Sequence, residues 1–321
     1  MAGIEKQAIE SIRGRSIALT KAFGMQTTLP AGEIILLPNI ATQLIDVTPI
    51  YNQLVRDKER LEAKWQDIAG KKTQLIGDTE LFVLDFLKVL KITVNRSVKL
   101  KDGKWSASDL SYYSLDETGG NLPVNLTESE VLSWAGSIKS GEEDRLLDKP
   151  TAPAMTNPTV AEVTTAADEA KPLIPATRQA LALLNDKRTE LDNANPDVDV
   201  LLESIWDLVE VRYKTSTKER QREMLRSWGV VYGTVGDPNT LTVLVKDSAG
   251  APLEGADVVL LETEGSASAN PEGRVSLETR TVGNITLRFS YPGKADKDVP
   301  VSIADDAEGT AIDLGIVVLE A

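Results

Sequence analysis

The chain has 321 residues, of which 49 are acidic and 35 basic, so its formal net charge at pH 7 is −14. A surface with this charge repels phosphate backbones and anionic lipid, which disfavours nucleic acid and membrane surfaces as partners and favours a basic protein. The sequence contains neither cysteine nor histidine, which excludes disulfides, thiol nucleophiles, Ser-His-Asp triads and metal sites built on these side chains. Chemistry based on carboxylate, Lys, Tyr or Ser remains open, as do oxygen-ligated Ca²⁺ and Mg²⁺.

Most of the chain before residue 237 has the apolar spacing of amphipathic helices. This spacing covers residues 4–21, 40–69, 78–98, 127–138, 175–191 and 201–227. Gly70 is expected to end the second of these helices as a C-cap. The sequence Asn-Ala-Asn-Pro-Asp at residues 193–197 is expected to be a turn. Residues 40–98 and 175–227 therefore each predict a helical hairpin.

Two local signals divide the middle of the helical region. Thr127 and Glu130 have the spacing of a capping box, in which each side chain accepts a backbone N–H of the other residue. We expect a helix to begin there. Residues 149–158 are rich in Pro, Thr and Ala and are expected to form a linker or an exposed loop.

Neither a signal peptide nor a membrane-spanning segment is expected. The N-terminal residues alternate charged and apolar side chains, which is not the pattern of a signal peptide. The most apolar run, residues 81–90, contains Asp85 and Lys88 and is too short to cross a bilayer. Three alternatives stay open: a cytoplasmic protein, a protein whose targeting segment was removed, and a protein exported inside an assembly.

From Leu241 onward the periodicity changes from helical to alternating. Leu241, Val243 and Val245 share one face of an expected strand, and the Asp-Ser-Ala-Gly sequence that ends at Gly250 is typical of a turn. Similar alternating runs, separated by Gly and Pro, continue to the end of the sequence. The pattern predicts an antiparallel β-sandwich.

These residues resemble the carboxypeptidase regulatory-like domain family, whose fold is a transthyretin-like sandwich. The matching elements are Val245-x-Asp247, Gly250-x-Pro-Leu-x-Gly-Ala-x-Val258, Gly273-Arg-Val-Ser-Leu277 and Gly283…Tyr291-Pro-Gly293. The resemblance implies a fold of seven strands. It also implies an accessory module that holds a partner, since domains of this family occur in many different proteins. The family's acidic turn is Asn270-Pro-Glu272 here, and Lys294 stands where an aromatic residue is usual. Metallocarboxypeptidases with such a domain need His ligands, so that activity is excluded.

The expected fold class is therefore α plus β and multidomain. An up-and-down helical bundle is predicted over residues 1–236, followed by a seven-stranded antiparallel β-sandwich over residues 237–321.

An acidic cluster near the end of the sequence is a candidate Ca²⁺ site, because loop carboxylates are typical calcium ligands. It consists of Asp296, Asp298, Asp305 and Asp306, with Glu308 beside them. The alternative is a solvated edge of the sandwich, since residues 239–321 hold 14 acidic but only 6 basic side chains, a net charge of −8.

The most basic segment contains Lys218, Arg220, Arg222 and Arg226. It is a candidate docking surface for an acidic partner, and the chain's own sandwich is one such partner. The alternative is that these cations complement the dipole at the end of a helix.

Three aromatic residues, Trp105, Tyr112 and Tyr113, follow a Lys-Asp-Gly-Lys turn. They are a candidate platform for a glycan or a peptide. The alternative is that they pack at the end of a helical core.

No motif places a nucleophile beside a base, so no catalytic residue and no cofactor is expected. We expect a non-enzymatic structural or adaptor protein that binds a protein partner or assembles with itself. The alternatives are a surface protein that binds carbohydrate or peptide and, third, an enzyme that uses carboxylates or Ser and Lys.

Overall fold

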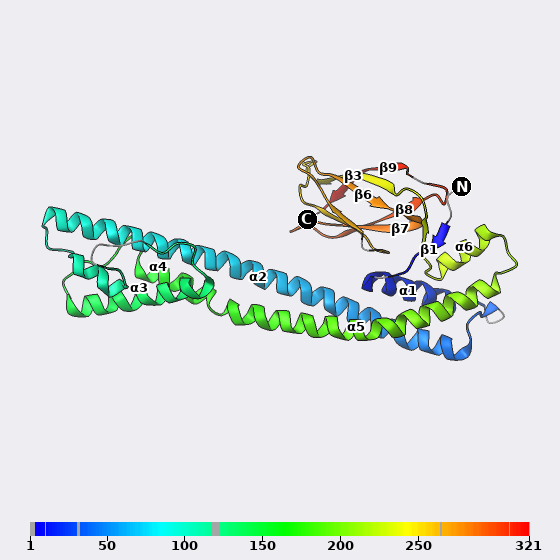
Figure 1. The fold of residues 1–321 in the computed structure, drawn as a ribbon, viewed down its shortest axis with the longest axis horizontal. Helices are drawn as coiled ribbons and strands as arrows, with labels where there is room; N and C mark the ends of the chain where they lie inside the picture. Colours follow the sequence, from blue (N-terminus) through cyan, green and yellow to red (C-terminus); the bar gives the residue numbers. More distant parts are fainter. Residues whose placement is uncertain are drawn as a thin grey trace. The chain divides into compact units, whose positions relative to one another are not determined.

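The computed structural model describes residues 4–9, 11–30, 33–116, 122–263, 265–307 and 309–320. Contacts divide the chain into two compact units: unit 1 combines residues 1–57 with 187–321, and unit 2 is residues 58–186. Six α-helices lie in the described ranges: α1 Ile12–Thr28, α2 Pro38–Leu100, α3 Glu128–Asp148, α4 Val160–Ala170, α5 Leu173–Arg212 and α6 Lys218–Ser227 (Figure 1). The 3-10 helix η2 covers Ala107–Tyr113.

The prediction of two helical hairpins was wrong, because the helix breaks expected at Gly70 and at residues 193–197 both lie inside continuous helices. Helix α2 has 63 residues and passes through Gly70, and α5 has 40 residues and passes through Pro196. A helical glycine costs only about 1 kcal/mol relative to alanine, so the helix-forming residues on either side of Gly70 outweigh it. Around Pro196, the Tyr51 hydroxyl donates to Asn195 at 2.6 Å, and the guanidinium of Arg15 in α1 binds Asp199 at 2.7 Å.

The predicted capping box is confirmed at the start of α3. The Thr127 side chain accepts a hydrogen bond from the Glu130 N–H, and the Thr127 N–H donates to the Glu130 carboxylate at 2.8 Å. These reciprocal bonds satisfy N–H groups that the first turn of a helix leaves without partners.

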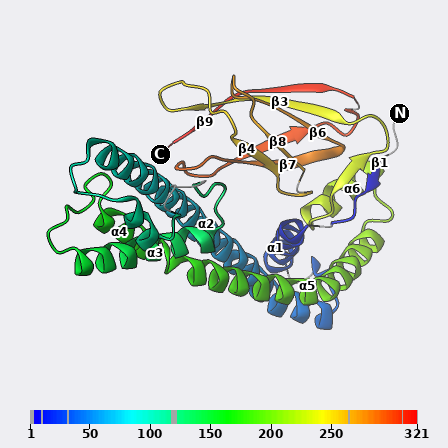
Figure 2. The same cartoon turned by 60° about the vertical axis from the view of Figure 1, so that its left-hand side comes forward.

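Two β-sheets follow the helices. The strands are β1 Ile4–Lys6, β2 Tyr232–Thr234, β3 Asn239–Asp247, β4 Asp257–Leu260, β5 Ser266–Ser268, β6 Arg274–Thr279, β7 Thr281–Ser290, β8 Lys297–Ile303 and β9 Ala311–Leu319. One sheet has the order β1-β2-β7-β4-β5 with β8 paired to β7, and the other has the order β6-β3-β9. Figure 2 shows β3 and β9 in one layer and β4 and β7 in the other.

Two sequence expectations about the strands need correction. Residues 4–6, expected in a helix, form β1, which pairs with β2 at the edge of the larger sheet. The sheets are not entirely antiparallel, because β3 and β9 pair in parallel. After β6 the chain passes through β7 and β8 of the other sheet. It then returns to the smaller sheet, where β9 runs in the same direction as β3.

The two sheets bury their apolar faces in a common core. Burial alternates along β3 and β7, and the buried side chains of both strands belong to one cluster, which includes Val243, Val245, Leu287 and Phe289. The same cluster contains side chains from α1, α6 and the ends of α2 and α5, among them the fully buried Trp228. This shared core explains why the compact units differ from the expected boundary at residues 236 and 237.

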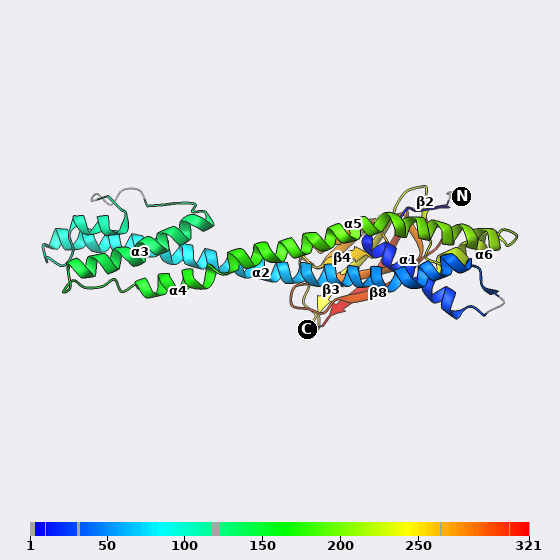
Figure 3. The same cartoon turned by 90° about the horizontal axis from the view of Figure 1, so that it is seen from below.

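Unit 2 has its own apolar core. Phe86 and Leu90 of α2, Tyr113 of η2 and Ile138 of α3 are buried together, and Figure 3 shows α3 and α4 in this part of the chain. Within the described ranges, no helix is both long enough and apolar enough to cross a membrane.

Candidate functional site

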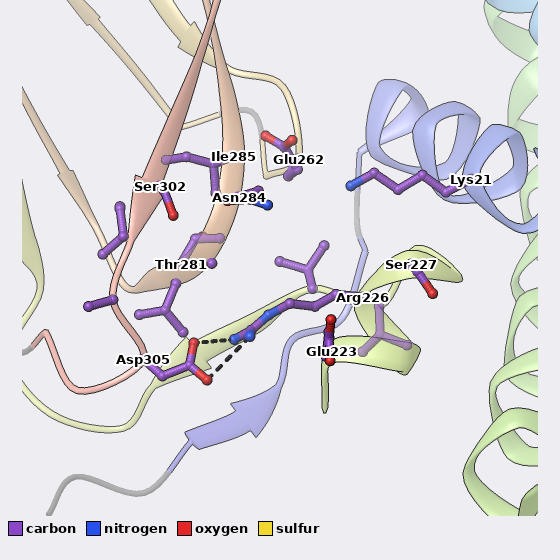
Figure 4. A pocket seen from close by; sticks show the side chains of 16 residues that line it. Lys21, Glu223, Arg226, Ser227, Glu262, Thr281, Asn284, Ile285, Ser302 and Asp305 are labelled. Carbon is purple, nitrogen blue, oxygen red and sulfur yellow. Dashed lines mark hydrogen bonds and ion pairs between the residues drawn. The ribbon is translucent and has the colours of Figure 1, made fainter. Parts of the chain in front are cut away.

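A cavity of about 620 Å³ lies in unit 1 between α1, α6 and the strands β7 and β8 (Figure 4). Its charged lining residues are Lys21, Glu223, Arg226, Glu262 and Asp305. They come from segments more than 200 residues apart in the sequence. Uncharged polar side chains, including those of Asn284 and Ser302, and apolar side chains, including those of Val230 and Ile285, line the rest.

The turn after α6 holds that helix against α1. Gly229 has a φ of +93°, and a Cβ at this position would lie 2.7 Å from the Cα of Ala18. Glycine is therefore required both for the conformation and for the close approach. The preceding residue, Trp228, is buried, and its carbonyl accepts a hydrogen bond from Trp206 Nε1 at 3.0 Å. These contacts fix the position of Arg226 at the end of α6.

Arg226 forms an ion pair with Asp305, just after β8. Its two terminal nitrogens lie 2.5 and 3.2 Å from the two oxygens of Asp305, and its guanidinium lies 5.2 Å from the centre of the Tyr232 ring. Gly283 leaves room for this side chain, since a Cβ there would be 2.7 Å from Arg226 Nε. The positive charge of Arg226 is thereby neutralised by Asp305 of the same chain.

The basic segment thus binds the chain's own β domain, one of the partners expected from the sequence. Arg222 also approaches Asp305, at 4.0 Å. Lys218 and Arg220 are exposed, and Arg220 pairs with Glu223 at 2.7 Å. Two of the four predicted residues therefore reach the β domain.

Glu262 lies in the turn after β4 and is only 4% exposed. Its carboxylate accepts the Thr286 N–H at 3.0 Å, while the Leu261 N–H donates to the Thr286 carbonyl at 3.0 Å. The Glu262 carboxylate thus accepts a β7 N–H group that the backbone carbonyl of a paired strand would otherwise accept. Burial raises the pKa of the Glu262 carboxyl above its ordinary value, because desolvation outweighs the N–H donors and the positive field of Lys21.

A second buried carboxylate, Glu142 of α3, lies in unit 2. Arg145 binds it through two hydrogen bonds of 2.9 and 3.0 Å, and the Tyr113 hydroxyl donates to it. Burial alone would raise the pKa of Glu142, but the bonds from Arg145 and Tyr113 hold this pKa below its ordinary value. Arg145, which has no exposed side-chain surface, also donates to the Pro153 carbonyl at 2.8 Å.

The aromatic residues of unit 2 do not form the exposed platform that the sequence suggested. Trp105 is 6% exposed and Tyr113 is fully buried. The Arg145 guanidinium lies 3.9 Å from the centre of the Trp105 ring and covers one face of it. The Tyr112 hydroxyl donates to Asp148 at 2.7 Å. These side chains therefore pack at the end of a helical core, although Trp105 also lines a polar cavity of about 490 Å³.

The acidic residues of the predicted Ca²⁺ site are not brought together. Asp298 at the start of β8 binds the Arg288 guanidinium at 2.6 and 2.7 Å, and Asp305 beyond the end of β8 binds Arg226. The strand from Asp298 to Ile303 alone spans roughly 16 Å and lies between these two carboxylates in the sequence. Asp296 and Asp306 are exposed, and Glu308 lies outside the described residues. Among the residues that are described, no group of three or more acidic side chains is arranged to hold a metal.

The sequence reasoning missed both buried carboxylates. The Glu142 and Arg145 spacing of three residues is a usable signal, because such pairs lie on one helix face. Glu262 directly follows the apolar run 258–261, and a charged residue in that place is a weaker signal of burial.

The two layered sheets share one apolar core and form a β domain. Residues 240–315 match the family model of the carboxypeptidase regulatory-like domain, and the helical region before them has no family match. The resemblance drawn from the sequence motifs is therefore confirmed for about a quarter of the chain. No curated protein matches the chain.

Similar solved structures include two complexes of a type II cohesin with an X-dockerin from Acetivibrio cellulolyticus, at 15% and 16% sequence identity. The alignments cover 25% and 26% of this chain and 56% and 57% of those chains, each with a TM-score of 0.21. This chain thus spans little more than half of either. A crystal structure of (S)-allantoin synthase aligns at 15% identity over 92% of this chain and 96% of that chain, also with a TM-score of 0.21. At this TM-score the likenesses carry no argument about fold or function.

Proposed function

We propose that the protein is a non-enzymatic adaptor, in which the helices anchor or assemble the molecule and the β domain docks a protein partner. The observation that carries this proposal is the match of residues 240–315 to the carboxypeptidase regulatory-like domain. Domains of this kind are accessory modules, so the match favours holding a partner over transforming a substrate.

The side chains of the cavity in unit 1 support docking. A catalytic serine needs a base within hydrogen-bond reach. Instead, the Ser227 hydroxyl donates to the Met224 carbonyl at 2.6 Å. Asp305 is engaged by Arg226, and the sequence has no His or Cys to supply another base or nucleophile.

Light scattering of the purified full chain, alone and after affinity capture from its native source, tests the proposal. We expect a defined self-assembly or a stoichiometric complex with a protein partner that survives a wash in moderate salt. The adaptor function would be contradicted if the protein were a strict monomer and captured no protein that a heat-denatured control sample does not also capture. Binding on a glycan array would favour the carbohydrate-binding alternative, and turnover in a broad hydrolase screen would favour an enzyme.

A further inference from the structure

The cavity in unit 1 contains a buried negative charge that the chain itself does not neutralise. Glu262 is 4% exposed, and its carboxylate accepts backbone N–H groups, among them that of Thr286 at 3.0 Å. Among the described residues no cation lies within ion-pair distance of its carboxylate. A buried carboxylate without a cation is costly, which makes a cationic group at this position strongly favourable.

Neither nearby cation is placed to supply this charge. Arg226 is committed to Asp305. Lys21 extends from α1 toward Glu262 and Asn284 (Figure 4), but its side chain is exposed and makes no ion pair with the carboxylate. Of the five charged lining residues, Arg226 pairs with Asp305 and Glu223 pairs with Arg220 outside the cavity. Among the described residues this leaves Glu262 as the lining carboxylate without an ion pair.

The remaining lining suits an ammonium group. Such a group has three N–H donors and needs several acceptors. The side chains of Asn284 and Ser302, each of which has an oxygen acceptor, lie on the cavity wall near the carboxylate. A volume of about 620 Å³ accommodates a lysine side chain together with part of its backbone.

We propose that this cavity receives a lysine side chain of the docked protein partner, and that the lysine ammonium binds Glu262. The proposal rests on the adaptor function and specifies where the partner is held. The net charge of −14 fits a basic partner, because opposite charge accelerates association.

The test titrates the full chain with a lysine blocked at both ends, Nα-acetyl-lysine methylamide, and follows the backbone amide signals of Gly283, Asn284 and Thr286. We expect saturable shifts with blocked lysine and none with the norleucine analogue, which has the same shape but no charge. Glu262→Gln should weaken binding at least about tenfold, because it removes the charge yet keeps an acceptor for the Thr286 N–H. Glu254→Gln removes an exposed charge of the same domain and should bind like the wild type.

Equal binding to Glu262→Gln and wild type, or equal response to norleucine, would overturn the proposal. Binding that appears only in Lys21→Met would also overturn it, because Lys21 would then be the natural occupant. Affinity capture separates this proposal from the adaptor function. A partner retained by both wild type and Glu262→Gln refutes the lysine site alone, whereas a wild type that captures no partner refutes the adaptor function.

Discussion

Two carboxylates of this protein are equally buried but differ in their partners. Glu142 in unit 2 is 5% exposed, and Glu262 in unit 1 is 4% exposed. Glu142 is bound by an arginine and a tyrosine, and its pKa is lowered, whereas Glu262 accepts backbone N–H groups, and its pKa is raised by burial. Burial makes the charged form of each carboxylate unfavourable, and its bonding partners determine whether this desolvation penalty is compensated.

The two sites therefore have different consequences. The charges of the Glu142 site are paired within unit 2, and Arg145 also covers Trp105 and reaches the Pro153 carbonyl. It stabilises the fold and leaves no charge for a ligand. The Glu262 site faces a cavity and lacks a cation, so a partner can complete it.

The largest effect is expected from Arg145→Met, which would make the Glu142 site resemble the Glu262 site. Removing one member of a buried pair leaves the other charge uncompensated and costs about 3–5 kcal/mol of unfolding free energy. Denaturant unfolding at pH 7 measures this loss. The double variant Glu142→Gln with Arg145→Met is the control and should lose less than the single variant. A single-variant loss under about 1 kcal/mol would break the comparison.

Gly229→Ala tests the contact that frames the Glu262 cavity. The left-handed backbone and the clash with Ala18 together should cost about 2–4 kcal/mol. Gly250 is the matched control, because it also has a positive φ, +86°, but no atom lies within 4 Å of its ideal Cβ. Gly250→Ala should cost only about 1 kcal/mol in the same unfolding experiment. Equal losses would mean that the approach of α1 to the turn after α6 is unimportant.

Glu262→Gln should stabilise the protein at pH 7, on the order of 1 kcal/mol, because it removes an uncompensated buried charge. The raised pKa means that the folded state holds this proton more tightly than the unfolded state, so wild-type stability falls as pH rises through the folded pKa. The gain should therefore vanish below about pH 4. Thermal unfolding between pH 4 and pH 7 measures it.

Glu142→Gln is the counterpart with the opposite sign. The lowered pKa of Glu142 contributes stability that is present at neutral pH and is lost as pH falls through the folded pKa. Stabilisation by both substitutions, or by neither, would show that the two carboxylates do not differ as the structure indicates.

The smallest effect is expected from Asp305→Asn, which releases Arg226. Both side chains of this ion pair are partly exposed, at 25% and 35%, so the stability loss should be about 1 kcal/mol or less. The Arg226 guanidinium then adds an unpaired positive charge to the cavity that it lines together with Glu262. We expect blocked lysine to bind this variant more weakly than the wild type in the same amide titration. Unchanged lysine affinity would show that Arg226 does not influence the site.

Local signals made part of the fold predictable. The capping box at Thr127 and the turn that ends at Gly250 depend only on neighbouring residues, and both are present. Gly70 and Pro196 were misleading, because a helix tolerates the small cost of one glycine and because α5 is held beside Pro196 by bonds from Tyr51 and Arg15. The parallel pairing of β3 with β9 depends on the order in which the chain crosses between two sheets, which alternation does not encode.

The candidate site was predictable only in pieces. Arg226 and Asp305 were both singled out from the sequence, but under separate hypotheses, because nothing local shows that residues 79 apart form a pair. Glu262 escaped attention because its cavity is formed by α1 and α6 as well as by its own turn. The burial of Glu262 and the pairing of Arg226 with Asp305 therefore follow only from the three-dimensional structure.

The most direct test is an NMR titration of the full chain with ¹³C-labelled glutamate side chains. It follows the Glu262 and Glu142 carboxyl carbons in one experiment. We predict that Glu262 titrates above the ordinary glutamate pKa of about 4.3 and Glu142 below it, and that blocked lysine lowers only the pKa of Glu262. A Glu262 pKa at or below the ordinary value, unchanged by blocked lysine, would contradict the account of an open, uncompensated docking site.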